Sequence, residues 1–520
     1  MNPIKEEYEV GIVGLGTIGR NLLWNAAGHG FSAAGYDMDV AKLATLQLEA
    51  GDRPVFAAPN LDSFAEAKLA TLQAEAGDAP VYAAPDVQSF VEALRRPRAV
   101  LIFVPAGPPV EAVITALLPH LEKGDLLVDG GNSHFRDTDR RVQALAADGI
   151  GFLGVGVSGG ERGARYGPSL MVGGRAEDYR RVQPLFEAIA ADAGGEPCAA
   201  LLGPGSAGHY VKMVHNGIEY GLIQLLAEAY DLLKRGLGLG NDDLAEVFAG
   251  WNQGALNGFL VAASAEVFRQ PDEHGSGRLV DAILAVAGMK GTGAWVSEEA
   301  LALGSPTPTI DAAVWMRSLS RLKAERVAAA QVLPGPQERS QEGAHPGAST
   351  RLVEERQRRT GNQKLGLGEL HDALYAGMLL TFAQGLALLG VASTAYGYGL
   401  DLEVVTRIWR AGSIIRAGLL EEVRAAYRRG SGSGLPNVLQ NPQLSTLLQE
   451  RSQGLRATVS AAAQAGLPVP GFSSALAYLD GYRSPWLPAN LVQALRDNFG
   501  AHGYERLDRP GRFHSEWGKG

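Results

Sequence analysis

Four polar side chains in the segment 208–226, GHYVKMVHNGIEYGLIQLL, have the types and the spacing of an acid–base site. On a helix, where successive residues are about 100° apart, one stripe carries Lys212, His215, Asn216 and Glu219. The remaining positions are mostly apolar, which is typical of a buried helix. Burial lowers the pKa of an amine and raises the pKa of a carboxyl group, toward the values that suit a general base and a general acid near neutral pH.

Two interpretations without catalysis fit the same stripe. Lys212 and Glu219 could form a buried ion pair, because these residue types are almost never fully buried without a partner. Alternatively, the stripe could lie on a hydrated surface. A catalytic stripe needs a cofactor site and a substrate site beside it. Evidence for such sites elsewhere in the chain would therefore favour the catalytic interpretation over the other two.

Length, charge and cysteine content narrow the class of protein. The 520 residues suffice for two or more domains, and the net charge of −9 does not attract nucleic acid. The single cysteine, Cys198, excludes an internal disulfide and a thiolate metal cage. The N-terminus lacks the apolar run of a signal peptide, and no uninterrupted apolar run of about 18 residues occurs. We expect a cytoplasmic enzyme without a metal and without nucleic-acid or membrane partners.

A glycine-rich turn near the N-terminus predicts a dinucleotide site. The apolar strand 10–13 is followed by the motif GLGTIG, residues 14–19, and by a helical pattern from Arg20. Such glycines let the backbone approach a pyrophosphate at the positive end of a helix. A second strand, 31–36, ends at Asp37, where a carboxylate can accept hydrogen bonds from an adenosine ribose.

A tandem repeat interrupts this pattern. Residues 41–64 recur as residues 67–90 with six differences, which indicates a duplication inside one loop-and-helix unit. A solenoid would need at least three stacked repeats. We therefore interpret one copy as an insertion at the edge of the domain, where added loop length costs little entropy.

Strands and helices then alternate again, which predicts an α/β fold with a doubly wound, Rossmann-like parallel sheet over residues 1–206. The expected strands are 99–104, 125–129 and 151–157, and the expected helices are 110–121 and 137–147. The loops after these strands, at 104–107, 129–133 and 157–160, would meet at one edge of the sheet. Their small polar side chains and backbone N–H groups indicate the wall of a site for a polar ligand.

The pattern from residue 207 onward is helical and predicts a large all-α domain over residues 207–484, followed by a C-terminal tail over 485–520. The expected helices are 222–233, 242–248, 257–268, 312–330, 367–389 and 404–429, with an exposed loop at 334–360. Most cations here would be solvated. Arg317 lies among apolar neighbours, and a buried guanidinium needs an anion.

Several of these segments together resemble the decarboxylating 6-phosphogluconate dehydrogenases of the pentose phosphate pathway. The segments are 129–133, 136–141, 157–170 (VSGGERGARYGPSL), 208–220 (GHYVKMVHNGIEY), 290–293, 409–416 (WRAGSIIR), 487–490 and 496–502. The resemblance runs from about residue 10 to the end, except for the repeat and the 334–360 loop. Shorter β-hydroxyacid dehydrogenases resemble only the first domain.

The resemblance implies roles for the stripe. Lys212 is similar to the base that takes the proton of the substrate's 3-hydroxyl while hydride leaves C3 for the nicotinamide. Glu219 is similar to the acid that protonates the enediol left after CO2 departs. Sugar and carboxylate contacts are implied for Asn132, Ser158, Gly159, Gly160, His215 and Asn216. Phosphate contacts are implied for Tyr220, Lys290, Arg317, Arg496 and His502. In the family, the counterparts of Arg496 and His502 come from the tail of the other subunit, so the resemblance implies a homodimer.

The resemblance also implies a set of cofactor residues, and two parts of this set depart from the family pattern. The set is Gly14, Leu15, Gly16, Thr17, Ile18, Gly19, Asp37, Met38, Asp39, Val104, Pro105, Ala106 and Asn132. Most members carry Asn-Arg-Thr at 37–39, which binds the 2′-phosphate of NADP, and lysine at 105. The resemblance implies NADP, whereas the carboxylate of Asp37 favours NAD. Arg53 in the repeat could compensate. A further departure is Ala294, where many members have lysine.

Two other functions compete with this interpretation. A non-catalytic dinucleotide-binding redox sensor would be expected to lack at least one of Lys212, Glu219, Arg317 and Arg496, and all four are present. An oxidoreductase for an unphosphorylated 3-hydroxyacid would leave the cations without an anion in a closed site, which is costly.

Overall fold

The computed structural model describes residues 8–39, 42, 81–84, 86–333, 335, 366–429 and 435–518. Within them, an eight-stranded sheet has the order β3-β2-β1-β4-β5-β6-β7-β8. Its strands are β1 (Val10–Val13), β2 (Ala33–Tyr36), β3 (Val81–Ala83), β4 (Ala99–Ile102), β5 (Leu126–Asp129), β6 (Gly151–Ser158), β7 (Ser169–Gly174) and β8 (Ala199–Gly203). All neighbours are parallel except β6 and β7.

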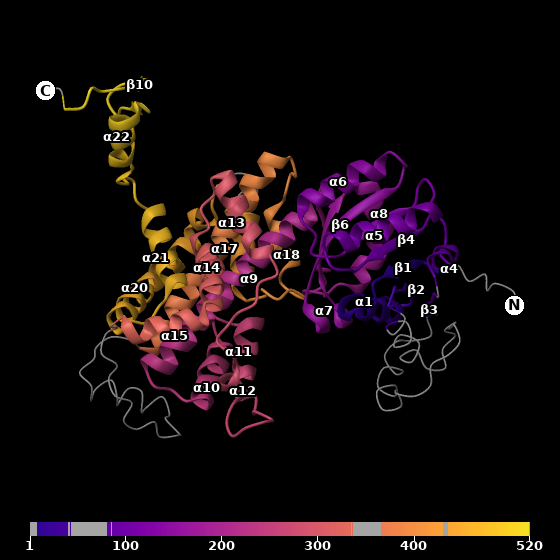
Figure 1. Ribbon diagram of the computed structural model, residues 1–520, viewed down its shortest axis with the longest axis horizontal. Helices are drawn as coiled ribbons and strands as arrows, with labels where there is room; N and C mark the ends of the chain where they lie inside the picture. The colour runs from indigo at the N-terminus through magenta and orange to yellow at the C-terminus, as the bar shows by residue number, and fades with distance from the viewer. Residues whose placement is uncertain are drawn as a thin grey trace.

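Helices cover both faces of this sheet, as expected for a doubly wound fold. One apolar core joins the strands to α1 (Thr17–Gly28) and α8 (Ala176–Ile189), and a second joins them to α4 (Val87–Glu92) and α5 (Pro108–Leu117). The α/β prediction is confirmed. In Figure 1 this part forms one end of the elongated molecule, and the helical part forms the other.

The antiparallel strand β7 corrects the expectation of a wholly parallel sheet. Only residues 159–168 separate β6 from β7, whereas a crossover to a parallel neighbour takes a dozen residues or more. The short helix α7 (Gly160–Tyr166) fills most of this connection, so β7 returns alongside β6. The sequence-based prediction also ended at β6 and included none of β7, α8 and β8.

The tandem repeat contributes to the sheet edge. The end of its second copy supplies β3, which pairs with β2, and the start of α4. The first copy, apart from Lys42, and the start of the second lie outside the described residues.

Two long helices form the centre of the helical part. α9 (Ala207–Asp231) packs against α17 (Leu367–Tyr396), and α17 also packs against α20 (Pro442–Ala465). By length and composition alone α17 could cross a membrane, but 83% of its most apolar window is buried inside the protein. The surrounding elements are α6 (Phe135–Ala146) of the first part and α10 (Asn241–Trp251), α11 (Phe259–Arg269), α12 (Leu279–Ala282), α13 (Thr292–Leu303), α14 (Pro308–Arg321), α15 (Lys323–Val332), α18 (Leu402–Ile408), α19 (Leu419–Arg429) and α21 (Pro470–Tyr482).

Three predicted helices have the wrong extent. The expected helix 404–429 is two helices, α18 and α19, separated by a loop at 409–418 that contains Gly412 with φ +65°. The expected helix 312–330 is divided at Leu322 into α14 and α15. The expected helix 222–233 is the second half of α9, which begins at Ala207. Helical periodicity did not reveal the two breaks, because the apolar pattern continues on both sides of each.

Glycines allow the start of α9 to lie directly on the sheet. A Cβ atom at Gly156 on β6 would clash with the Cβ of Lys212, and a Cβ at Gly208 would clash with the carbonyl oxygens of Gly154 and Met171. Side chains at these glycines would therefore push the helix away from β6 and β7. The backbone of α9 approaches the sheet closely enough to bury Lys212 between the two parts of the chain.

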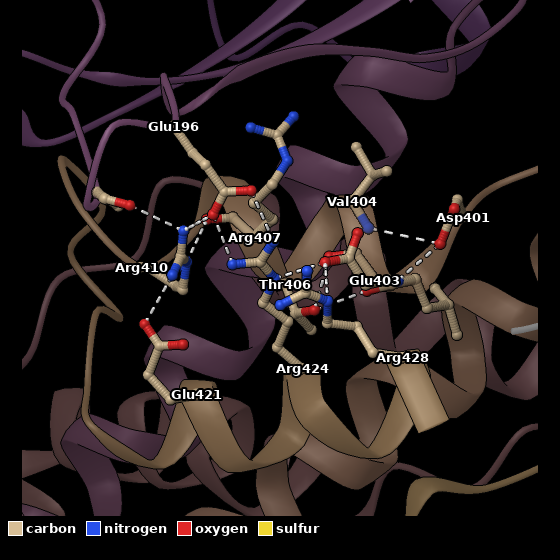
Figure 2. A network of polar contacts seen from close by, with 12 residues as sticks. Glu196, Asp401, Glu403, Val404, Thr406, Arg407, Arg410, Glu421, Arg424 and Arg428 are labelled. Carbon is tan, nitrogen blue, oxygen red and sulfur yellow. Dashed lines mark hydrogen bonds and ion pairs between the residues drawn. The ribbon is translucent and has the colours of Figure 1, made fainter. Parts of the chain in front are cut away.

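A network of ion pairs also joins the two parts. Glu196, which precedes β8, accepts hydrogen bonds from Arg424 at 2.7 and 2.9 Å and from Arg410. Arg424 also pairs with Glu403 on α18, and Arg410 pairs with Glu421 on α19 at 2.9 Å (Figure 2). The hydrogen bonds from Arg424 lower the pKa of Glu196 to about 2. The network fastens the loop before β8 to both helices that flank the 409–418 loop.

Candidate active site

The predicted stripe of α9 lies mostly in the interior. Lys212 is 7% exposed, His215 is fully buried and Asn216 is 9% exposed. The side chain of Glu219, two turns after Lys212, is 24% exposed. The stripe therefore leads from the interface with the sheet toward a partly open end, which is an arrangement that a substrate can reach from one side.

The Lys212 amine is desolvated and has no hydrogen-bond or ion-pair partner in the described part of the chain. Burial lowers its pKa to about 8, although the charge of Glu219 acts in the opposite direction. Burial also raises the pKa of Glu219, against the charges of Lys212 and Arg317. No Lys212–Glu219 ion pair occurs among the described residues, so the non-catalytic ion-pair interpretation lacks its contact. The two pKa values shift toward neutrality, as a base and an acid require.

His215 connects the stripe to two other segments. Its Nε2 lies 3.1 Å from Ser158 Oγ at the end of β6 and 2.9 Å from Ser413 Oγ in the 409–418 loop. Its Nδ1 lies 3.2 Å from Asn216 Oδ1. Burial and the neighbouring Lys212 hold the pKa of His215 well below its usual value, so the ring is neutral.

Ser413 was not among the predicted site residues. Its segment, WRAGSIIR, lay inside the expected helix 404–429, and a serine within a helix has no distinctive signal. The glycine at 412, next to a small hydroxyl side chain, is the feature that could have indicated a loop. Gly412 packs on the carbonyl oxygen of Gly167, so the loop lies against the first part of the chain.

Two loops at the sheet edge lie where the sequence placed the substrate wall. After Ser158 come Gly159 and Gly160, with φ +130° and +63°. A Cβ at Gly159 would lie 2.5 Å from the Gly412 carbonyl oxygen, whereas Gly160 faces open space. Gly160, the first residue of α7, therefore has open space on the side where a Cβ atom would stand.

The second loop follows β5 and presents Asn132 at its exposed tip. The fully buried carboxylate of Asp129 shapes it. This carboxylate accepts hydrogen bonds from Gly131 N at 3.0 Å, Ser133 Oγ at 2.6 Å and Arg141 Nη1 at 2.9 Å. The loop is therefore held by its own buried anchor and does not need a ligand to keep its shape.

Three of the predicted phosphate-side residues belong to one neighbourhood. The Arg317 guanidinium lies 3.4 Å from the centroid of the Tyr220 ring. Arg317 is half-buried, pairs with no carboxylate among the described residues, and donates to Gly288 O at 3.4 Å. Gly288 belongs to the exposed loop that carries Lys290. Among the residues that the structure describes, the cationic side chains at this end of the site thus have no carboxylate within ion-pair distance.

Arg496 and His502 lie elsewhere, on the C-terminal tail. The tail contains α22 (Ala489–Gly500), β9 (Tyr504–Glu505) and β10 (Arg512–Phe513), and both residues are exposed. Figure 1 shows α22 and β10 projecting from the body beyond α21, at the end opposite the sheet. Within one chain, the structure does not bring Arg496 and His502 together with Lys212.

The tail is organised around one buried carboxylate. Asp497 is fully buried and accepts hydrogen bonds from Gly503 N at 2.8 Å, His514 Nδ1 at 2.9 Å and Trp517 Nε1 at 2.8 Å. Burial alone would raise the pKa of Asp497, but these bonds and one from Ser515 N hold it well below its usual range. Arg496 and the loop carrying His502 are therefore held in a fixed relation.

The glycine-rich turn has the geometry of a dinucleotide site. Gly14 adopts φ +91°, and a Cβ at Gly19 would clash with the Gly14 carbonyl oxygen. Gly16, just before α1, has nothing within 4 Å of the position of a Cβ, so the backbone there is open to a ligand. Close packing at the first and third glycines and free space at the second match the requirements of a bound pyrophosphate.

Asp37 both shapes this turn and faces a cation. Its carboxylate is 8% exposed and accepts hydrogen bonds from Leu15 N at 2.7 Å and Asp39 N at 2.8 Å. Lys42 Nζ lies 3.3 Å from Asp37 Oδ2. This lysine was not predicted.

The other predicted cofactor residues are more exposed. Met38 is 68% exposed, and Val104, Pro105 and Ala106, which follow β4, are partly or fully exposed. Arg53, the expected compensating cation, lies outside the described residues.

Comparisons with known proteins agree on one family. The chain matches the NAD binding domain of 6-phosphogluconate dehydrogenase over residues 9–203 and the C-terminal domain of 6-phosphogluconate dehydrogenase over residues 208–517. A decarboxylating 6-phosphogluconate dehydrogenase of Synechococcus elongatus is 44% identical over 512 residues, which cover 98% of this chain and 99% of the relative. The NADP(+)-dependent, decarboxylating enzyme of Bacillus subtilis is 42% identical over 99% of this chain and 100% of the relative.

A solved structure gives the same result. The 6-phosphogluconate dehydrogenase of Plasmodium falciparum, described in its apo form and in complexes with NADP+ and with 6-phosphogluconate, superimposes with a TM-score of 0.85. It is 35% identical, and the match covers 98% of this chain and 100% of the other.

The desolvation of Lys212 gives a testable titration. We expect the Lys212 amine to titrate near pH 8 in an NMR titration of selectively 13C-lysine-labelled protein, with Lys212→Arg used to assign its signal. In Glu219→Gln the midpoint should fall further, because the carboxylate charge that favours the ammonium form is removed. Glu228→Gln is the matched control, since Glu228 lies on the same helix but faces Gly471 and Phe472. A midpoint at the ordinary lysine value near 10.5 would contradict the assignment.

Proposed function

The chain belongs to the 6-phosphogluconate dehydrogenase family, and we propose that the stripe of α9 performs the acid–base steps of its reaction. The enzyme oxidatively decarboxylates 6-phospho-D-gluconate to D-ribulose 5-phosphate and CO2, with reduction of a nicotinamide dinucleotide, in the pentose phosphate pathway. The observation that carries the proposal is the buried Lys212 amine, which has no partner in the described part of the chain and shares its stripe with Glu219.

The proposed sequence of proton transfers follows the order of the stripe. A nicotinamide dinucleotide bound at the glycine-rich turn supplies the hydride acceptor for C3. The neutral Lys212 amine takes the proton of the 3-hydroxyl as the C3–H bond breaks. The resulting ammonium then donates a proton to the C3 oxygen while the C1–C2 bond breaks. CO2 leaves, and the electron pair of the broken bond forms the enediol. Glu219 protonates the enediol carbon that becomes C1 of ribulose 5-phosphate.

The remaining predicted residues have chemistry that suits the two ends of this substrate. Ser158, Gly160 and Asn132 offer a hydroxyl, a backbone N–H group and an amide to the sugar and carboxylate. Arg317 and Lys290 suit the phosphate, because a guanidinium binds phosphate through two hydrogen bonds and does not lose its proton. Their lack of acidic partners among the described residues supports this assignment.

We further propose a homodimer. Each chain would consist of a dinucleotide-binding domain (residues 1–206), a helical domain (207–484) and a C-terminal tail (485–520). The tail of one chain would supply Arg496 and His502 to the site of the other. Large exposed apolar side chains along the tail support this, because such surfaces are typical of contact sites. They are Trp486, Leu487, Leu491, Val492, Leu495 and Phe499, and the last is 74% exposed.

For the cofactor, we propose that Asp37 makes NAD the preferred dinucleotide and that Lys42 limits this preference. A carboxylate accepts a hydrogen bond from a free 2′-hydroxyl and repels a 2′-phosphate. Lys42 neutralises part of the charge of Asp37 and is 44% exposed at the same position. Since the Bacillus subtilis relative is described as NADP(+)-dependent, the departure at 37–39 makes cofactor choice a distinguishing property of this chain.

Loss of the proposed base should stop turnover without unfolding the protein. Lys212→Ala is expected to lower kcat by about 100- to 10,000-fold, the usual contribution of a general base, while the Kd for the dinucleotide stays the same. Turnover is followed at 340 nm with 6-phosphogluconate, and dinucleotide binding by calorimetry. Lys123→Ala, at an exposed lysine, is the control. Near-wild-type turnover in Lys212→Ala would refute the assignment.

The shared active site can be tested by complementation. Lys212→Ala and Arg496→Ala should each be nearly inactive as homodimers. When the two are co-expressed, half of the dimers are mixed, and one site in each mixed dimer carries neither substitution, so about one quarter of wild-type activity should return. If each chain builds its own complete site, no activity returns, because every site then carries one of the two substitutions.

The cofactor proposal predicts opposite effects of two changes. Asp37→Asn combined with Met38→Arg should shift the ratio of kcat/KM values toward NADP. Lys42→Ala should reduce kcat/KM for NADP more than for NAD, because the remaining carboxylate repels the 2′-phosphate more strongly. Steady-state kinetics with both dinucleotides measures these ratios, with Lys123→Ala again as the control. A parent enzyme that strongly prefers NADP would overturn the argument from Asp37.

A further inference from the structure

Two serine hydroxyls from distant segments approach the same nitrogen of His215. Ser158 lies at the end of β6, and Ser413 lies in the loop between α18 and α19. Their Oγ atoms lie 3.1 and 2.9 Å from His215 Nε2. Ser158 is 2% exposed, and both Ser413 and His215 are fully buried. The three groups must therefore satisfy their hydrogen-bonding capacity largely from one another.

A backbone N–H group occupies one acceptor position on each of these hydroxyls. The Ile414 N–H group donates to Ser158 Oγ at 3.2 Å, and the Ile415 N–H group donates to Ser413 Oγ at 3.1 Å. A peptide N–H group can only donate, so each serine oxygen acts as an acceptor there. Each serine keeps one hydroxyl proton to donate, and Nε2 is their shared acceptor when the neutral His215 carries its proton on Nδ1.

The other ring nitrogen agrees with this direction. Nδ1 lies 3.2 Å from Asn216 Oδ1 and 4.0 Å from Glu219 Oε2, both of which are oxygen atoms. A proton on Nδ1 satisfies this side of the ring, whereas a proton on Nε2 would place a lone pair against the amide oxygen. With its oxygen held by His215, Asn216 directs its NH2 group away from the ring. That group has no acceptor among the described residues, so it remains available to a ligand.

The lone pair of Nε2 can take one strong hydrogen bond, and two hydroxyls compete for it. We propose that Ser413 is a positioning residue: it donates to Nε2, holds His215 in the Nδ1–H form and leaves the Ser158 hydroxyl free to donate to a substrate oxygen. Ser413 has the shorter distance to Nε2, and Ser158 directly precedes the two glycines, 159 and 160, of the sheet-edge loop. The substrate part of this inference rests on the proposed role of Ser158, whereas the tautomer part does not.

This arrangement predicts a double-mutant pattern in KM. In Ser413→Ala the Ser158 hydroxyl turns to His215, so KM for 6-phosphogluconate should rise about fivefold to tenfold, the effect of one lost neutral hydrogen bond. Because the bond is made equally in the ground state and the transition state, kcat should change little. Ser158→Ala should raise KM similarly. The double variant should add little further to KM, since the hydroxyl is already lost.

The tautomer provides an independent readout without substrate. In 15N NMR of selectively 15N-histidine-labelled enzyme, His215 should show protonated Nδ1 and unprotonated Nε2 in the wild type. Each single alanine variant should keep this form through the remaining serine. Only the double variant should show a mixture. The His215 signal is assigned by its loss in His215→Asn, and thermal unfolding checks the fold of every variant.

A conservative variant separates positioning from packing. Ser413→Cys keeps nearly the same volume but offers a weaker donor, so its KM should lie between wild type and Ser413→Ala. Additive KM effects in the double variant, an unchanged KM in Ser413→Ala, or a wild-type His215 protonated at Nε2 would each overturn the proposal. If Lys212→Ala were active, the proposed base would fail, yet the tautomer measurement would still test the hydrogen bonds from the two serines to His215.

Discussion

The close approach of α9 to the sheet is the constraint on which the site depends. Glycines at 154, 156 and 208 remove the side chains that would separate helix and strands. The first turns of α9 are therefore buried, and the Lys212 amine lies in the interface between the two parts of the chain. Its lowered pKa follows from this burial. The lowered pKa of this amine is thus a consequence of backbone packing, because burial alone destabilises the ammonium form.

The same interface aligns groups from three segments. His215 on α9, Ser158 at the end of β6 and Ser413 in the 409–418 loop meet in one hydrogen-bonded cluster. The loop that carries Ser413 is held from both sides, since Gly412 packs on the sheet domain and Glu196 pairs with Arg410 in the loop and with Arg424 on α19. Holding the two parts of the chain in one relative position keeps the donors and acceptors of the cluster at bonding distance.

The C-terminal tail follows a different principle, since it is ordered by its own contacts. Asp497 gathers donors from 503, 514, 515 and 517, and so gives the tail a fixed shape without the body of its own chain. A preformed tail with exposed apolar side chains loses little conformational entropy when it binds another surface. The proposed delivery of Arg496 and His502 to a site on another chain relies on this property of the tail.

Local patterns in the sequence determined the stripe of α9, the glycine-rich turn, the α/β character of the first part and the family of the chain, because helical spacing and turn chemistry depend on neighbouring residues. Only the tertiary structure decided the direction of strands, the breaks in helices and the placing of residues far apart in the chain. It made β7 antiparallel, broke the expected helix 404–429 at the loop of Ser413 and set Arg496 apart from Lys212. Ser413 and His215 are 198 residues apart, and contacts over such separations arise from packing between elements, which no local periodicity records.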